Sequence, residues 1–290
     1  MHIKGLGRVN KKISTIIGNY QKSNFEKFIR KRNFRDLLRN KVQLQNSINI
    51  ELVTFTESKT FSDLLLSILS FITSVGLPYR WTVYADDEFT QDQKAILDEF
   101  KFLLYQDWFT NVEEEDKKKF KDKWQLRKYL SFSTHPLAGT TIFLDADVLF
   151  YKSFNKYIQF IKESNWYLPE PTDGFSIDFE IVAREEYKAD MFIINSGFLI
   201  LNHMPPWNLG MGYLSECLAT NSITHFTEQS AVNIAYVNDS FAKILEPRVF
   251  HVSSVDHFKI GVLKTDNLAI RHYVSIIRNK MWQSGWKHFI

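Results

Sequence analysis

Two aspartates, Asp145 and Asp147, are separated by one residue inside the apolar run TIFLDADVLF. A buried, ionised carboxylate without a partner costs several kcal/mol, so two of them in this setting require a compensating charge. Residues two apart in an extended segment face the same side, and paired carboxylates suit a hard divalent cation such as Mg²⁺ or Mn²⁺, which also takes phosphate oxygens as ligands. The spacing therefore predicts a metal site, with ordinary turn chemistry as the alternative.

The segments around these aspartates follow the pattern of an α/β protein. Apolar and periodic runs predict strands at residues 48–56, 79–87 and 140–150 and helices at residues 62–76 and 124–133. We interpret residues 91–108 as a polar amphipathic stretch and residues 111–124 as a solvated helix surface. Strands that alternate with helices predict a mostly parallel sheet with helices on both faces, and such sheets bind ligands at the carboxyl ends of their strands. Asp145 is therefore expected at the binding edge.

Composition and charge divide the chain into two parts. The 290 residues are 44% hydrophobic, which is enough for a large core, and the single cysteine, Cys217, excludes an internal disulfide and fits a reducing compartment. Residues 1–48 carry twelve Lys and Arg against two acidic residues, a balance of +10, which leaves a balance of −7 for the remainder. We therefore expect a basic amphipathic helical extension over residues 1–48 and an α/β domain over residues 49–290.

The extension places its apolar side chains at helical spacing, with basic residues between them. These apolar positions are Ile13, Ile16, Ile17, Tyr20, Phe25, Phe28, Ile29, Phe34, Leu37 and Leu38. Either the helices pack on the main domain and expose a basic face, or they attach peripherally to an anionic membrane. No Gly-aromatic motif accompanies the basic residues, so we predict no nucleic-acid partner. The start of the chain lacks the pattern of a secretory signal, and we expect a cytoplasmic protein for which residues 1–48 are the candidate contact with the inner membrane face.

Four motifs in order make the sequence resemble the family-8 glycosyltransferases, which have the GT-A fold. FLDADVLF resembles their D-x-D element, NSGFLILN at 195–202 their N-[SA]-G strand, TEQSAVN at 227–233 their D-Q-x-x-x-N helix start, and RHYVS at 271–275 their late H-[FY]-x-[GS] segment. The resemblance implies a GT-A catalytic domain that moves a hexose from a nucleotide-diphosphate sugar, expected to be UDP-linked, to a saccharide or glycolipid acceptor. It also implies a metal cofactor, Mn²⁺ or Mg²⁺, and a retaining mechanism.

The resemblance assigns roles to individual residues. The metal ligands would be Asp145, Asp147 and His272, and an imidazole ligand moves the preference towards Mn²⁺. The side chains at the reacting sugar would be Gln229, Glu228 and Asn195. The donor would be bound by Thr54, Thr56, Asp87, Lys128, Asp145, Ser196, Arg278 and Lys280.

Several of these assignments have alternatives. The motif at Asn195 could be a turn before a strand, Thr227 with Glu228 could be helix-capping chemistry, and His272 could be a structural histidine. Where the family has a lysine for the diphosphate, this chain offers either Arg278 or Lys280. Upstream, either Arg127 or Lys128 could be the donor-binding cation, and solvation of a helix surface accounts for them equally well.

The acceptor and the stereochemistry are less constrained by the sequence. The segment EPTDGFSIDFEIVAREEY at 170–187 is irregular, aromatic and acidic, and we expect it to be the acceptor loop. Inverting chemistry needs a carboxylate base, for which Asp173, Asp178, Glu180 and Asp190 are available. Two other classes stay open: a sugar nucleotidyltransferase, although LVTFTESKTFS lacks the expected glycines, and a catalytically inactive glycan-binding or membrane-associated scaffold.

Overall fold

The computed structural model describes residues 4–30, 32–170, 193–253, 265–274, 277–283 and 286–289. Of the expected acceptor loop only Glu170 belongs to these ranges, so the prediction for that loop lies outside the described residues. The same holds for Ser275, the last residue of the RHYVS motif, and for the four carboxylates considered as inverting bases.

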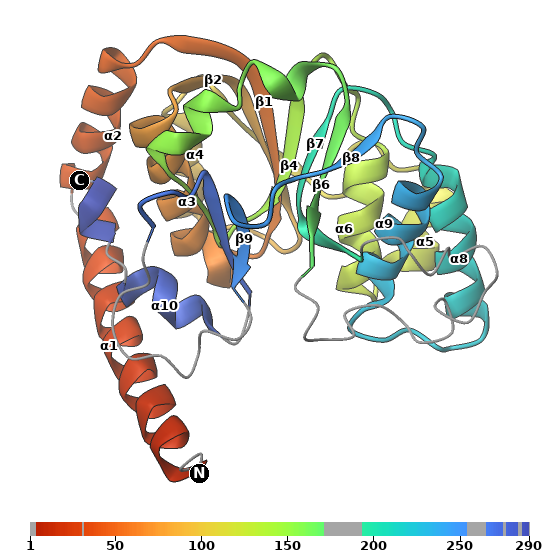
Figure 1. The fold of residues 1–290 in the computed structure, drawn as a ribbon, viewed down its shortest axis with the longest axis horizontal. Helices are drawn as coiled ribbons and strands as arrows, with labels where there is room; N and C mark the ends of the chain where they lie inside the picture. The colour runs from red at the N-terminus through yellow and green to blue at the C-terminus, as the bar shows by residue number, and fades with distance from the viewer. Residues whose placement is uncertain are drawn as a thin grey trace.

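A seven-stranded sheet forms the centre of the molecule (Figure 1), with the strand order β3-β2-β1-β4-β7-β6-β8. Its strands are β1 (Ser47–Thr56), β2 (Leu77–Ala85), β3 (Leu103–Asp107), β4 (Thr141–Asp145), β6 (Asn165–Pro169), β7 (Ile194–Leu201) and β8 (Ala242–Ile244). The first four strands are parallel to one another, whereas β7 is antiparallel to both of its neighbours. The prediction of a mostly parallel α/β sheet is confirmed.

A second, three-stranded sheet has the order β5-β10-β9. Its strands are β5 (Val148–Phe150), β9 (Phe250–Ser253) and β10 (Ile270–Tyr273). The chain turns at Ala146 and Asp147 between β4 and β5, so the run at 140–150 is two strands in two sheets rather than one. The prediction that strand alternation aligns the two aspartates is therefore wrong, because a turn brings them together.

Helices cover both faces of the large sheet. They are α1 (Lys4–Arg30), α2 (Arg32–Leu44), α3 (Phe61–Ser74), α4 (Gln91–Asp98), α5 (Glu114–Phe120), α6 (Trp124–Ser133), α8 (Trp207–Ala219), α9 (Thr227–Val237) and α10 (Arg278–Gln283). Leu52 of β1 packs in the core shared with α3 and α10, and its neighbour Val53 packs in the core shared with α6 and α9. A strand buried on both faces explains the unbroken apolar run in β1.

Helix α3 is apolar on every side because it is enclosed on every side, with thirteen of its fourteen residues buried. Its few hydroxyls are used internally. Ser67 Oγ donates to the carbonyl oxygen of Val148 at 2.7 Å, and Ser74 Oγ donates to that of Phe150 at 3.2 Å. These bonds fix β5 on α3, and with it the turn that carries Asp147.

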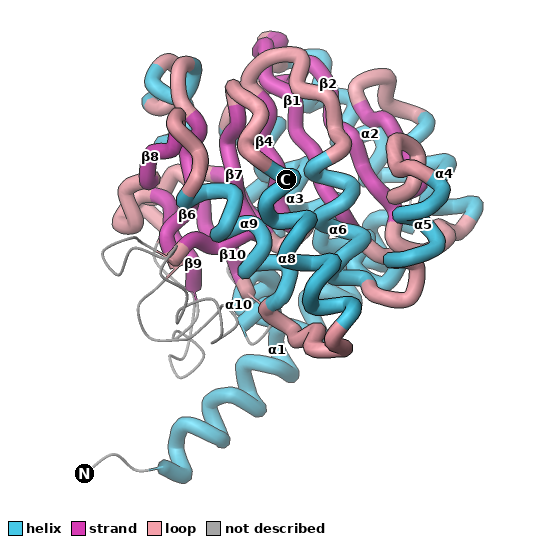
Figure 2. The backbone as a smooth tube through the Cα atoms, turned by 90° about the vertical axis from the view of Figure 1, so that its right-hand side faces the viewer, coloured by secondary structure: helices cyan, strands magenta, loops and turns pink. Residues whose placement is uncertain are grey.

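The two N-terminal helices are only partly separate from the α/β body. Phe25, Phe34 and Leu38 are fully buried in the core, and the Phe25 ring lies 5.2 Å from that of Trp282, centroid to centroid. The start of α1 instead projects beyond the body (Figures 1 and 2). Its following turns pack on α10, where Gln283 Nε2 donates to the carbonyl oxygen of Ser14, and on their outer side Ile16 is 68% exposed. The division of the chain after residue 48 stays a prediction.

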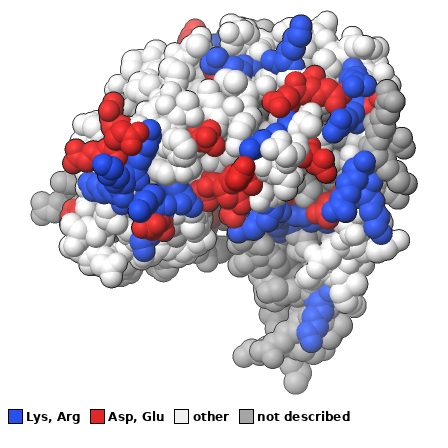
Figure 3. All heavy atoms as spheres, turned by 180° about the vertical axis from the view of Figure 1, so that it is seen from behind, with Lys and Arg blue, Asp and Glu red and all other residues white. Residues whose placement is uncertain are grey.

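None of the described helices is long and apolar enough to cross a membrane. On the face shown in Figure 3, acidic and basic side chains are interspersed over the body, and one basic patch lies among uncharged side chains on the projection at the lower right.

Candidate functional site

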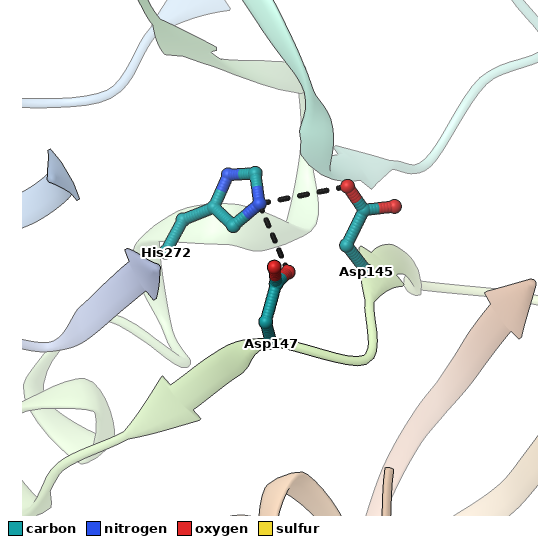
Figure 4. Close-up of side chains that lie close together, drawn as sticks. All are labelled: Asp145, Asp147 and His272. Carbon is teal, nitrogen blue, oxygen red and sulfur yellow. Dashed lines mark ion pairs between the residues drawn. The ribbon is translucent and has the colours of Figure 1, made fainter. Parts of the chain in front are cut away.

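Asp145, Asp147 and His272 converge where the two sheets meet (Figure 4). Asp145 ends β4, Asp147 lies in the following turn, and the pairing of β10 with β5 sets His272 opposite Val148, the residue after Asp147. The Nε2 atom of His272 lies 3.1 Å from Asp147 Oδ1 and 3.5 Å from Asp145 Oδ2. Residues far apart in the sequence thus present three ligand atoms that lie within 4.8 Å of one another.

The donor set of this cluster fits a divalent ion. Two carboxylates and one imidazole combine the ligands of Mg²⁺ and Mn²⁺ with a nitrogen that favours Mn²⁺. Asp147 Oδ1 is buried and faces Nε2 of His272 at 3.1 Å. Both atoms are candidate ligands, and an ion at this position would bind them in place of their ion pair.

Asn195 orients the imidazole. Its Oδ1 atom accepts a hydrogen bond of 2.8 Å from Nδ1 of His272 and one of 2.9 Å from the backbone N–H of Gly197. Its Nδ2 atom donates to Glu170 Oε2 at 2.5 Å, which fixes the direction of the amide. Because Nδ1 donates to Asn195, Nε2 is the ring nitrogen that faces the two aspartates, and it would be the atom free to ligate an ion once its own proton is lost.

Gly197 provides the space for this imidazole. A Cβ atom at position 197 would lie 2.1 Å from His272 Cε1 and 2.8 Å from Asp145 Oδ2. In the structure this glycine gives room to the side chain of His272, a candidate metal ligand. Gly197 lies within β7, so the alternative of a turn before a strand is wrong for this motif.

Lys128 and Glu228 extend the cluster on the side of α6 and α9. Lys128 Nζ lies 2.8 Å from Asp145 Oδ1 and 3.5 Å from Glu228 Oε1. Ser196 Oγ donates to Glu228 Oε2 at 2.8 Å, and the Oε1 atom of Gln229 accepts from the backbone N–H of Ser196 at 3.2 Å. The five residues form one connected network from β4 to α9.

Arg278 approaches the cluster of Asp145, Asp147 and His272 from α10. Its Nε and Nη2 atoms donate to Asp147 Oδ2 at 2.9 and 2.6 Å. Lys280, the other candidate for the diphosphate cation, is 1% exposed and buried along α10. Of the two upstream candidates, Lys128 contacts Asp145, whereas Arg127 pairs with Asp86.

The surrounding cations keep both aspartates ionised. Burial would raise the pKa of Asp145, but the charge of Lys128 and the hydrogen bond from His272 hold that pKa well below its usual range. Burial would likewise raise the pKa of Asp147, and the charges of Arg278 and His272 keep it low. Burial acts to lower the pKa of His272, but Asp147 and Asp145 together raise it to about 9. The two ionised aspartates therefore concentrate negative charge that attracts a cation.

Three predicted donor-binding residues lie outside this cluster. Thr54 is fully buried in β1 and accepts a hydrogen bond of 3.0 Å from Trp81 Nε1, so its side chain belongs to the core. The Thr56 hydroxyl, at the carboxyl end of β1, is 2.8 Å from that of Thr60. Asp87, after β2, is exposed and accepts a hydrogen bond of 2.8 Å from Ser58 Oγ.

Helix α9 differs from the prediction in one detail, and two carboxylates near the site were not predicted. The N-cap of α9 is Phe226 without a side-chain cap, so the capping alternative is wrong for Thr227, whereas Glu228 does lie in the first turn. Glu170, which supports Asn195, gave no separate signal. Asp63, on α3, lies 4.0 Å from Arg278 Nη1, and its signal was available, since it is the single charged residue in the helix FSDLLLSILSFITS.

Comparison with protein-family models and with curated proteins gives no match, whereas solved structures match the fold. A crystal structure of the galactosyltransferase LgtC with donor and acceptor sugar analogues matches with a TM-score of 0.56 and 12% identity, over 82% of this chain and 93% of that one. The apo form of the glycosyltransferase GlyE from Streptococcus pneumoniae TIGR4 matches with a TM-score of 0.54 and 12% identity, over 84% of this chain and 62% of that one. The chain therefore has the GT-A fold of these glycosyltransferases, as the resemblance predicted.

Proposed function

We propose that the protein is a metal-dependent glycosyltransferase that moves a hexose from a UDP-sugar to a saccharide or glycolipid acceptor. The observation that carries this proposal is the convergence of Asp145, Asp147 and His272 between Lys128 and Arg278, in a chain with the GT-A fold. Departure of a nucleoside diphosphate develops negative charge, and a metal site bordered by fixed cations stabilises such charge. The LgtC structure was solved with donor and acceptor sugar analogues, which supports the same substrate classes here.

Each group of residues has a distinct task in this proposal. Asp145, Asp147 and His272 would hold the ion, Mn²⁺ by preference, and the ion would supply Lewis-acid stabilisation of the leaving diphosphate. Asn195 fixes the orientation of the His272 imidazole through its hydrogen bond with Nδ1. Arg278 offers N–H donors to the diphosphate, since an arginine fork suits phosphate oxygens.

The sugar would lie on the side of Ser196, Glu228 and Gln229. Glu228 is buried, is paired with Lys128 and accepts a hydrogen bond from Ser196, so it is held in place rather than presented to an acceptor hydroxyl as a base. This arrangement supports a retaining outcome. Proton NMR of the first product formed from an α-linked donor tests it: an α-linked product is expected, and a β-linked product contradicts retention.

Turnover assays separate this proposal from the two alternatives. Incubation with UDP-glucose or UDP-galactose and Mn²⁺ should release UDP, slowly by hydrolysis and faster with an added saccharide acceptor. Excess EDTA should stop the reaction. Formation of a UDP-sugar from UTP and a sugar 1-phosphate would instead identify a nucleotidyltransferase, and a thermal shift with UDP and Mn²⁺ without any turnover would identify an inactive binding protein.

We also propose that the exposed side of α1 over residues 13–20 contacts an anionic membrane, where glycolipid acceptors would be reached. Ile13, Ile16, Ile17 and Tyr20 are 43%, 68%, 45% and 65% exposed on one helix. The extension also carries a positive balance of +10 over residues 1–48. Apolar side chains among basic residues are the pattern of an interfacial helix, and each basic residue near the surface contributes on the order of 1 kcal/mol.

Point substitutions test the membrane contact better than truncation does. Phe25 of α1 is fully buried in the core, so we expect removal of the extension to destabilise the domain. The double variant Ile16→Asp, Tyr20→Ser should lose co-sedimentation with phosphatidylglycerol vesicles at low salt and keep wild-type UDP-sugar hydrolysis. Phe160→Ser, at a position that is 71% exposed on the body, is the control and should sediment normally. Unchanged sedimentation of the double variant contradicts the proposal.

A further inference from the structure

Asp63 is a buried carboxylate for which the proposed reaction has no role so far. Its side chain is 1% exposed. The Oδ1 atom accepts hydrogen bonds from Lys22 Nζ of α1 at 3.1 Å and from Trp282 Nε1 of α10 at 3.0 Å. The Oδ2 atom is buried and makes no hydrogen bond to any residue in the described ranges. A carboxylate oxygen in this condition calls for a physical explanation, because leaving it unpaired lowers stability.

Arg278 lies between this oxygen and the metal cluster. Two of its donors, Nε and Nη2, bind Asp147 Oδ2 at 2.9 and 2.6 Å, while Nη1 lies 4.0 Å from Asp63 Oδ2. A distance of 4.0 Å is within ion-pair range but too long for a hydrogen bond. The guanidinium therefore binds Asp147 through Nε and Nη2 and directs Nη1 towards Asp63.

We propose that Asp63 is a positioning residue that retains Arg278 in the site when Asp147 ligates a metal ion. The inference rests on the proposed metal site. An ion bound to Asp147 shares the charge that now attracts Arg278, so that ion pair weakens. A movement of the guanidinium by about 1 Å would bring Nη1 to a hydrogen-bond distance of about 2.9 Å from Asp63 Oδ2 and would satisfy that oxygen.

The consequence is a competition between Arg278 and the metal ion for Asp147, which Asp63 biases towards the metal. When Asp63 is charged, Arg278 has a second carboxylate to bind, so a metal ion displaces it from Asp147 more easily. Without that charge, Asp147 is the remaining ion-pair partner of Arg278 among the residues that the structure describes, and the metal ion must displace Arg278 from Asp147 without compensation.

A double-mutant cycle on Mn²⁺ affinity tests this mechanism. Titration calorimetry with MnCl₂ alone should give an affinity about fivefold weaker for Asp63→Asn than for wild type, the scale of coupling between neighbouring charged groups. Arg278→Met should bind Mn²⁺ more tightly than wild type, because the competitor is gone. Adding Asp63→Asn to Arg278→Met should then change the affinity by less than twofold.

The matched control is Lys22→Met, which removes the partner on the Oδ1 side of the same carboxylate. It should lower the melting temperature without weakening Mn²⁺ binding. If Asp63→Asn weakens Mn²⁺ binding equally in both backgrounds, or not at all, Asp63 is structural and the inference is overturned. If wild type does not bind Mn²⁺, the metal-dependent function fails as well, so the two failures are distinguishable.

A measurement on the unsubstituted chain covers the case in which Asp63→Asn does not fold. The Nε–H signal of Arg278 in ¹⁵N NMR is identified by its loss in Arg278→Met. On titration with Mg²⁺, a diamagnetic ion, this signal should shift yet stay protected from solvent exchange, as expected for a guanidinium held by Asp63. Collapse to the position of a free arginine would overturn the inference.

Discussion

Replacing Gly197 with alanine tests the packing that places His272. The new Cβ atom would lie 2.1 Å from His272 Cε1, and an ordinary contact begins at 3.4 Å, so the ring must retreat by more than 1 Å. That movement breaks the 2.8 Å hydrogen bond to Asn195 Oδ1. Inserting a methyl group into a packed site costs about 1 to 3 kcal/mol, which for a chain of this size is roughly 2 to 8 °C in melting temperature. Loss of the support for a metal-binding histidine lowers metal affinity by about 10- to 100-fold.

The assay pairs differential scanning calorimetry with Mn²⁺ titration, and the chain provides a matched control. Gly212, on the exposed side of α8, has no atom within 4 Å of the equivalent Cβ position. Gly212→Ala should therefore keep its Mn²⁺ affinity and gain up to about 1 kcal/mol of stability, because alanine is the better helix former. A Gly197→Ala protein with the wild-type melting temperature and wild-type Mn²⁺ affinity would refute the geometry described for the site.

Two further predictions concern Glu51 and Gln229. Burial would raise the pKa of Glu51, but hydrogen bonds from His135 and Arg80 lower it from 4.5 to about 2. The ionised carboxylate therefore stabilises the fold above pH 4.5, and this contribution is lost as the pH falls towards 2. The contribution to the free energy of unfolding is roughly 3 kcal/mol. In Glu51→Gln the free energy of unfolding should therefore fall less steeply between pH 5 and about pH 2 than in wild type. The same pH dependence in both proteins would contradict the stabilising role of the Glu51, His135 and Arg80 contacts. Gln229→Ala should lower kcat for transfer more than it raises the donor KM, the pattern of a contact made chiefly in the transition state. A normal kcat with a lowered melting temperature would make Gln229 a structural residue.

Local patterns predicted the elements whose sequence preferences agree with their packing. The helix predicted at 124–133 is α6, with the same bounds. The strand predicted at 48–56 is β1, which begins one residue earlier, at Ser47. The strand β3 was missed because Leu103–Asp107 is short, lies at the edge of the sheet and mixes apolar with polar residues. An edge strand of this kind lacks the continuous apolar signal of a central one.

Relations between distant segments could not be predicted from local patterns. Asp145 and Asp147 were identified from their spacing, yet the turn that joins them depends on β5 pairing with β10, more than a hundred residues later. Gly197 has a role only because His272 packs against it. Asp63 looked like one charge in an apolar helix, and its role depends on Arg278, which lies at the other end of the chain.

The central claim, that Asp145, Asp147 and His272 bind a divalent ion for glycosyl transfer, is tested most directly with Asp147→Asn. Asparagine keeps the size of the side chain and removes its charge. Titration with Mn²⁺ in the presence of UDP, together with UDP-sugar turnover on the same samples, should show binding and activity in wild type and in the exposed control Asp92→Asn, and neither in folded Asp147→Asn. Undiminished Mn²⁺ binding and turnover in Asp147→Asn would contradict the account.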